Sequence, residues 1–124
     1  MVEITVVLIP VGKTTEREVA ALRTEVQGAV QRLRGVERVG PVRSQAPEGA
    51  KGVAEAVGAF LVGLPAGAVS DVFDVIKGVL TRPAQPPAKV KVTADDVELE
   101  FDPRRVSLDD MASFVERLRP KGAA

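Results

Sequence analysis

The stretch GAKGVAEAVGAFLVGLPAGAVSDVFDVIKGVL, residues 49–80, dominates the middle of this 124-residue sequence. It is rich in Gly, Ala and Val, and its larger apolar residues recur at helical spacing. Pro65, which stands between two nearby glycines, interrupts this spacing. The stretch therefore predicts two helices. Their apolar faces are Val53, Val57, Phe60, Leu61 and Leu64 in the first helix and Val69, Val72, Phe73, Ile76 and Leu80 in the second.

Before this stretch, the sequence predicts a strand, a helix and a second strand. Residues 2–9 are dense in β-branched aliphatic side chains, which indicates a strand with at least one buried face. Thr15 and Glu18 have the spacing of a capping box, in which each side chain satisfies a free backbone amide at a helix start. The apolar spacing that follows predicts a helix that Gly35 ends. Residues 36–42 are a weaker strand candidate, and the proline within them favours a sheet edge.

After residue 80, a proline-containing connection leads to a predicted β-hairpin. Residues 89–93 and 97–101 alternate apolar and charged side chains, which is the pattern of strands with one face in water. The residues between them, 94–96, are predicted to form the turn. Ser107 is expected to cap a final helix. The apolar face of that helix is Met111, Phe114, Val115 and Leu118.

The predicted order of elements is β-α-β-α-α-β-β-α, which indicates an α+β fold. We expect a small mixed β-sheet of three to four strands with the helices packed on one face. The length of the chain fits one ordinary domain. We assign this domain to residues 1–120 and expect residues 121–124 to be a disordered tail.

The composition excludes several classes of functional site. The sequence has no His, Cys, Trp or Tyr, so imidazole or thiolate metal sites and His-activated serine nucleophiles are impossible. Seventeen basic and seventeen acidic residues cancel, which removes the broad positive field that attracts nucleic acids. No signal or transit peptide is recognisable, so a cytoplasmic location is expected. We predict no catalytic residue, no metal and no cofactor, and hence no enzyme.

The segment Gly12-Lys13-Thr14-Thr15 resembles the end of a phosphate-binding loop. The complete motif requires a glycine five residues before Gly12, and that position is Val7, inside the first predicted strand. We therefore interpret Lys13 as a solvated loop residue. Acidic pairs and arginine clusters are also better explained as wet helix faces, turns and helix starts. The acidic pairs are Asp71/Asp74, Asp95/Asp96 and Asp109/Asp110, and the first arginine cluster surrounds Arg34 and Arg38.

The central stretch is too short for a simple membrane span. Its longest uncharged run, residues 56–70, has fifteen residues, whereas a transmembrane helix needs about twenty. A simple span is therefore excluded. A membrane-perturbing component that uses a helical hairpin over residues 49–80 remains the alternative function.

Several segments together resemble the effector-associated constant component family, small α+β proteins of bacterial conflict or immune systems. The segments are QRLRG at 31–35, FLVG at 60–63 and VIKGVL at 75–80, with the hairpin that follows the proline-containing connection. The resemblance implies a non-catalytic adaptor or regulatory component. Its expected partner is an effector or sensor protein, for example a caspase-like protease, and the chain is also a candidate homo-oligomer.

We predict that the partner binds the first central helix on the side opposite its apolar face. The side chains there are small, so another backbone can approach closely. The predicted contact residues are Glu55, Gly58, Ala59 and Val62.

Overall fold

The computed structural model describes residues 2–40, 58–94, 97–105, 112–114 and 116, and all structural statements below concern these residues. Their strands form one five-stranded sheet in the order β2-β3-β1-β4-β5, and all neighbouring strands are antiparallel. The elements are β1 (Val2–Pro10), α1 (Glu16–Gln31), β2 (Arg38–Gly40), β3 (Ala59–Leu64), a 3-10 turn (Ala66–Ala68), α3 (Val69–Leu80), β4 (Ala88–Ala94) and β5 (Val97–Phe101).

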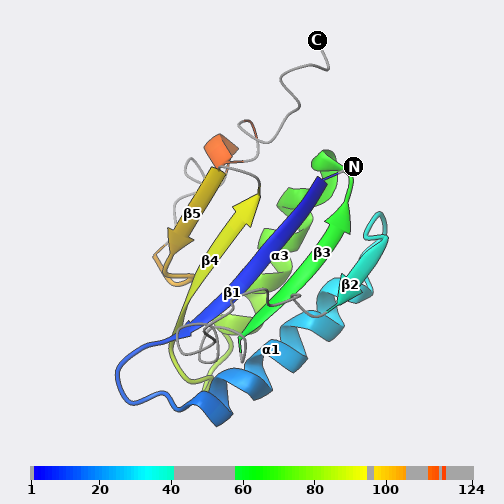
Figure 1. Cartoon of the computed structure of the whole chain (residues 1–124). Helices are drawn as coiled ribbons and strands as arrows, with labels where there is room; N and C mark the ends of the chain where they lie inside the picture. Colours follow the sequence, from blue (N-terminus) through cyan, green and yellow to red (C-terminus); the bar gives the residue numbers. More distant parts are fainter. Residues whose placement is uncertain (1, 41–57, 95–96, 106–111, 115, 117–124) are drawn as a thin grey trace, which may run out of the picture.

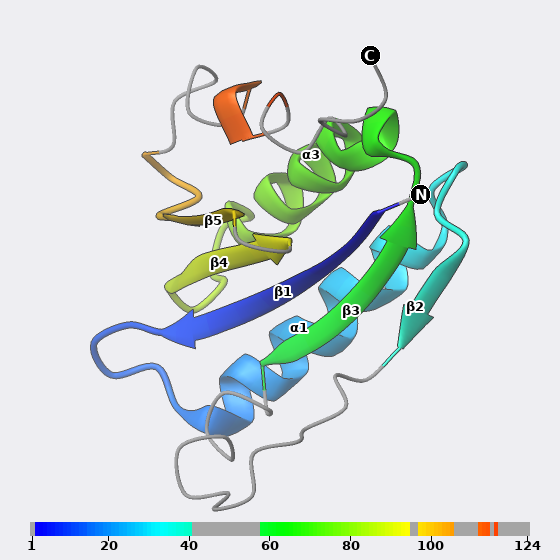
Figure 2. The ribbon, with the colours of Figure 1, turned by 45° about the horizontal axis from the view of Figure 1, so that its top comes forward.

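The fold has two layers. Helices α1 and α3 pack side by side on one face of the sheet; α3 lies behind the strands in Figure 1, and α1 lies behind β1 and β3 in Figure 2. The predicted α+β class and the packing of helices on one face are confirmed. β1 is the central strand, because two strands lie on each side of it.

The path of the chain explains the strand order. In β1-α1-β2 and again in β3-α3-β4, a helix connects two parallel strands that another strand separates. Two such split β-α-β units interleave, which is the arrangement called ferredoxin-like, and β5 extends it by a hairpin. Many unrelated functions occur on this arrangement, so the topology alone assigns none.

The start of α1 follows from the capping box. The backbone amide of Glu18 donates to Thr15 Oγ1 at 3.1 Å, and the backbone amide of Thr15 donates to Glu18 Oε1 at 2.9 Å. The helix ends at Gln31, one turn before the predicted end. Gly35 instead lies in the turn toward β2, where its φ of 90° is a conformation that glycine adopts without strain.

The core lies between the helices and the sheet. Alternate residues of β1, namely Ile4, Val6 and Leu8, point toward the helices and are buried. Phe73 of α3 packs edge-to-face against Phe101 and Phe114, with ring centroids 5.7 and 5.6 Å apart. No polar or charged residue is buried among those described, so the core is held together by apolar packing.

The prediction of a helix before Pro65 is wrong for its second half. Residues 59–64 form β3, which pairs with β1 on one side and β2 on the other. A short apolar run fits a buried strand as well as a helix, and pairing with two distant strands decides between them. Residues 49–57 lie outside the described residues.

The predicted sheet was wrong in two respects, and both follow from β3. The sheet has five strands instead of three to four, and it is antiparallel instead of mixed. β3 lies between β1 and β2, which run in the same direction, and β3 runs opposite to both. Each of its two pairings is therefore antiparallel.

Other predictions are confirmed. The second central helix is α3 with the expected buried face, β2 is a short edge strand, and β4 and β5 form the hairpin. Residues 112–114 and 116 are helical, and Phe114 is buried. The rest of the predicted final helix, the turn residues Asp95 and Asp96, and the tail 121–124 lie outside the described residues. No helix among those described is long and apolar enough to cross a bilayer.

Candidate interaction surface

The structure places two of the four predicted contact residues in β3 and a third directly before it. Gly58 precedes β3, and its carbonyl accepts a hydrogen bond from the backbone amide of Leu8 at 2.9 Å. Ala59 and Val62 are strand residues that are 6% and 0% exposed. The helical face on which this site was predicted is therefore not formed by these residues. Glu55 lies outside the described residues.

A different candidate interaction surface lies on the side of the sheet that α1 and α3 do not cover. This side faces the viewer in Figure 1. We call this side the open face. Because Ile4, Val6 and Leu8 point toward the helices, the alternate residues of β1 point toward the open face. The centre of the open face consists of Thr5, Val7 and Ile9 of β1 and Leu61 of β3, all of which are partly exposed.

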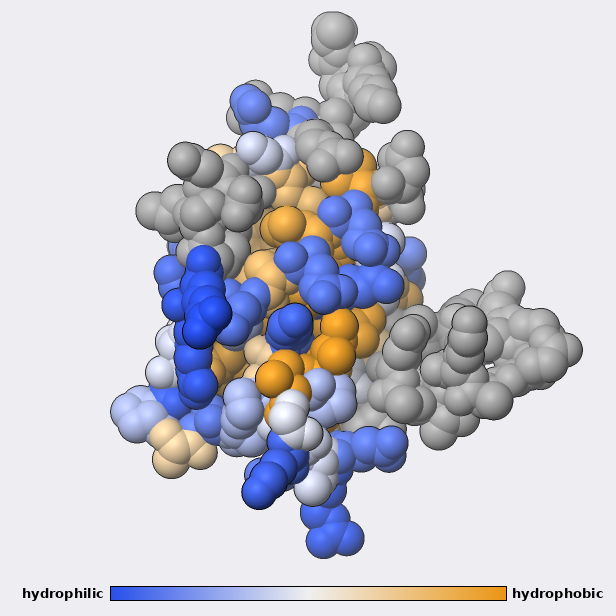
Figure 3. Space-filling model, turned by 90° about the vertical axis from the view of Figure 1, so that its left-hand side faces the viewer, coloured by the Kyte–Doolittle hydropathy of each residue, from blue (hydrophilic) through white to orange (hydrophobic). Residues whose placement is uncertain are grey.

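Acidic side chains lie at the β5 edge of the open face. Glu98 stands opposite Thr93, and Glu100 stands opposite Lys91, so both carboxylates share the face of the β1 residues Thr5 and Val7. Lys91 Nζ lies 3.5 Å from Glu98 Oε2. Viewed from the side of β5, the molecule shows hydrophobic surface interspersed with hydrophilic side chains (Figure 3).

The β2 edge of the open face carries Arg38, which is paired with Glu3 of β1. Arg38 Nη2 lies 2.6 Å from Glu3 Oε2, and these side chains are 72% and 52% exposed. Gly63 stands between Arg38 and Glu3 in the register of the three strands. Because glycine has no side chain, the arginine reaches across β3 to the glutamate. Exposed pairs of this kind stabilise a fold by only about 0–1 kcal/mol, so Arg38 is available to other partners.

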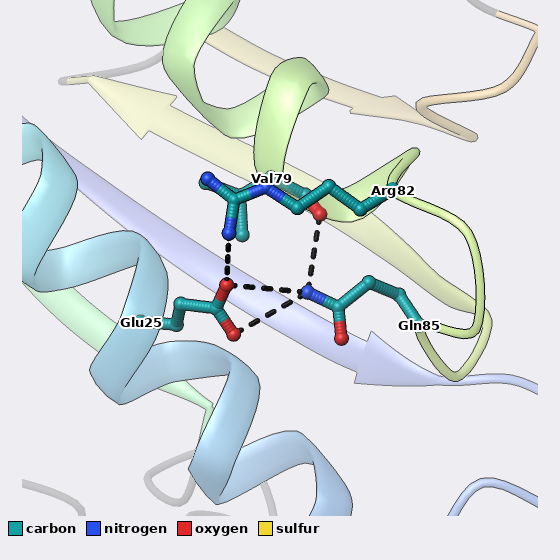
Figure 4. A network of polar contacts seen from close by, with 4 residues as sticks. All are labelled: Glu25, Val79, Arg82 and Gln85. Atoms are coloured by element: carbon teal, nitrogen blue, oxygen red, sulfur yellow. Dashed lines mark hydrogen bonds and ion pairs between the residues drawn. The ribbon is translucent and has the colours of Figure 1, made fainter.

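A polar network ties the connection after α3 to α1 (Figure 4). Glu25 accepts hydrogen bonds from Arg82 Nη1 at 2.5 Å and from Gln85 Nε2 at 3.3 Å, and Gln85 Nε2 also donates to the carbonyl of Val79 at 3.2 Å. A shallow pocket beside the network is lined by Glu18, Glu25 and Gln85 together with apolar neighbours. These contacts fix the connection after α3 against α1. They do not bring an acid, a base and a nucleophile together, as a catalytic site would require.

The structure supports the interpretation of Lys13 as a solvated loop residue and not as part of a phosphate-binding loop. Val7 is paired on both sides within β1, and Lys13 is an exposed residue of the turn after it. Thr14 Oγ1 donates to the carbonyl of Pro87 at 2.7 Å, which fastens this turn to the chain before β4. Asp71 and Asp74 are exposed on α3 as predicted. Within the described parts of the chain, no three acidic residues gather as a metal site.

The sequence did not predict the open face as a candidate interaction surface, although the charge pattern of two of its strands indicates a solvent-exposed face. The alternation of Lys89 and Lys91 in one strand and of Glu98 and Glu100 in the next was correctly assigned to a wet face. What was missing was β3, which brings Leu61 and Arg38 onto the same surface. Comparisons with protein-family models, curated proteins and solved structures find no match for this chain.

Proposed function

We propose that this protein is a non-catalytic adaptor or regulatory component of a bacterial conflict or immune system, which acts by protein–protein contact. The observation that supports this most is the open face. It presents partly exposed aliphatic side chains, Val7, Ile9 and Leu61, on the rigid centre of a sheet, between edges that carry Arg38 and Glu98.

The physical character of this surface suits recognition of another protein. Protein interfaces commonly combine an apolar centre with a polar, charged rim. β-Branched side chains such as those of Val7 and Ile9 have few rotamers. These side chains therefore lose little conformational entropy when a partner fixes them in a complex. The charged edges then favour one orientation of the partner over others.

The class of partner comes from the sequence resemblance. It suggests an effector or sensor protein, for example a caspase-like protease, whose activity the adaptor couples to a trigger. A partner of that kind acts inside the cell, so the proposal includes a cytoplasmic location. The membrane-perturbing alternative needs a helical hairpin over residues 49–80. Residues 59–64 form β3 instead, which disfavours this alternative.

The test uses the purified chain and the purified effector candidates encoded by neighbouring genes. Binding is measured by isothermal titration calorimetry. We expect one candidate to bind, and we expect Val7→Lys to weaken its affinity at least tenfold, because a charge replaces an apolar side chain at the centre of the open face. Asp74→Lys, on the exposed side of α3, is the matched control and should bind as the natural protein does.

Two results would count against the proposal. If no neighbouring effector binds, the adaptor function is wrong. If Val7→Lys binds with unchanged affinity and an intact circular dichroism spectrum, the function stands but its contact surface lies elsewhere.

A further inference from the structure

We propose that the open face pairs with the open face of a second copy of this chain, giving a two-fold symmetric dimer whose axis runs along β1. This inference rests on the proposed function in that both use the open face for protein contact, so the second copy and the effector compete for the same surface. It goes further because it names the occupant, the symmetry and the charged residues that meet across the interface.

The strand order sets the geometry. β1 is the middle strand of five, with β3 and β2 on one side and β4 and β5 on the other. A two-fold axis between the two sheets and along β1 exchanges these sides. β2 of each copy then lies over β5 of the other, and β1 lies over its own equivalent. The same patch serves both copies, as an isologous interface requires.

Charge complementarity supports this axis. Arg38 stands at the level of Glu3 along β1, and Glu98 stands at the level of Thr5, as the registers across the sheet show. The offset is two residues, or about 7 Å along the strand, and packed sheets lie about 10 Å apart, so the two backbones are about 12 Å apart, which an arginine and a glutamate side chain span together. Each Arg38 can therefore reach Glu98 of the second copy, and symmetry makes this contact twice.

The alternative axis is disfavoured by like charges. If the two-fold axis ran across the strands, β5 would lie over β5 and β2 over β2. Glu98 and Glu100 would then face the same carboxylates of the second copy, and Arg38 would face Arg38. Juxtaposed like charges at an interface are strongly unfavourable. On the proposed axis, Glu3 is the one acid of the described strands that meets its own equivalent, and Arg38 Nη2 lies 2.6 Å from its carboxylate.

The centre and the size of the open face also fit a second copy. Val7 and Ile9 lie on the axis, so each packs against the same apolar residue of the other chain. Five strands about 4.8 Å apart and about 20 Å long give a footprint of about 500 Å². Stable interfaces bury about 600–1,000 Å² of accessible surface per partner, and accessible surface exceeds a flat footprint. The open face thus lies at the small end of this class.

The test is a charge-exchange experiment monitored by sedimentation equilibrium. The natural protein should form a dimer at micromolar concentration. Arg38→Glu and Glu98→Arg should each raise the dimer dissociation constant at least tenfold. An equimolar mixture of the two variants should recover the dimer, because in the mixed pair both edges carry opposite charges. Asp74→Lys is the control and should dimerise normally.

The outcomes separate this inference from the proposed function. A natural protein that stays monomeric at millimolar concentration overturns the dimer. So does a dimer that neither charge variant weakens, or one that the mixture fails to restore although both variants keep the melting temperature of the natural protein. If the protein is monomeric and Val7→Lys still abolishes effector binding, the adaptor function survives and only the dimer is wrong.

Discussion

At the scale of single residues, Gly58 is a position where the surrounding packing leaves no room for a side chain. A Cβ atom there would lie 2.3 Å from the carbonyl oxygen of Leu8 and 2.8 Å from Cγ1 of Val19. Neither can withdraw easily, because the first is backbone of the central strand and the second is buried. The Gly58→Arg substitution, which a helical surface would have accepted, should therefore prevent folding.

A milder substitution makes this measurable. We expect Gly58→Ala to lower the free energy of unfolding by about 1–3 kcal/mol, as overpacking of a core does. Gly78→Ala is the matched control, because a Cβ there meets no atom within 4 Å and the position is helical. It should stabilise the protein by about 0.5–1 kcal/mol. Urea denaturation measures both, and equal effects would contradict the packing around Gly58.

Two phenylalanines offer a second prediction at this scale. Phe60 of β3 is 0% exposed and Phe114 is 2% exposed, so truncation of either leaves a cavity in the core. We expect Phe60→Ala and Phe114→Ala each to lower the free energy of unfolding by about 3–5 kcal/mol. Chemical denaturation is the measurement. A Phe60→Ala protein of natural stability would mean that β3 does not bury this side chain.

At the scale of elements, α1 depends on its first turn. Thr15→Ala removes the hydroxyl that accepts from the Glu18 amide, and we expect it to lower the free energy of unfolding by about 1 kcal/mol. Thr24→Ala is the control within the same helix. The Thr24 hydroxyl donates back to the carbonyl of Ala20, an interaction that does not favour helices, so its loss should not destabilise the protein, and the higher helix propensity of alanine should stabilise it slightly. Thermal denaturation of both variants tests this, and a neutral Thr15→Ala would show that the cap is dispensable.

The elements also show where the sequence was informative. The capping box, the buried face of α3 and the β4–β5 hairpin are local patterns, and each was predicted from neighbouring residues. β3 was not, because AFLVGL has no period of its own and takes its conformation from β1 and β2. The open face could not be predicted for the same reason. Arg38 and Glu3 are brought together only once β3 lies between their strands.

At the scale of the whole molecule, the proposed dimer should respond to salt. Two exposed Arg38–Glu98 contacts, each contributing about 0.5 kcal/mol, amount to about a fivefold change in the dissociation constant. Raising the ionic strength from about 0.01 M to about 1 M shortens the screening length from about 30 Å to about 3 Å. We expect the dissociation constant to rise by about that factor. The dimer of Arg38→Ala should show no such rise, because it lacks these ion pairs and its two facing Glu3 carboxylates no longer have Arg38 beside them; sedimentation equilibrium compares the two. An identical salt response would argue against these ion pairs.

The central position of β1 also governs the order in which the chain can fold during its synthesis. β1 leaves the ribosome before either neighbour, yet Val6 pairs with Phe60 on one side and with Val92 on the other. One edge of β1 stays unpaired until β3 has emerged and the other until β4 has emerged, and such long-range pairing is slow and prone to aggregation. A nascent chain that stops before β4 therefore lacks one side of its central strand, which makes β1 the segment that a chaperone would be expected to protect.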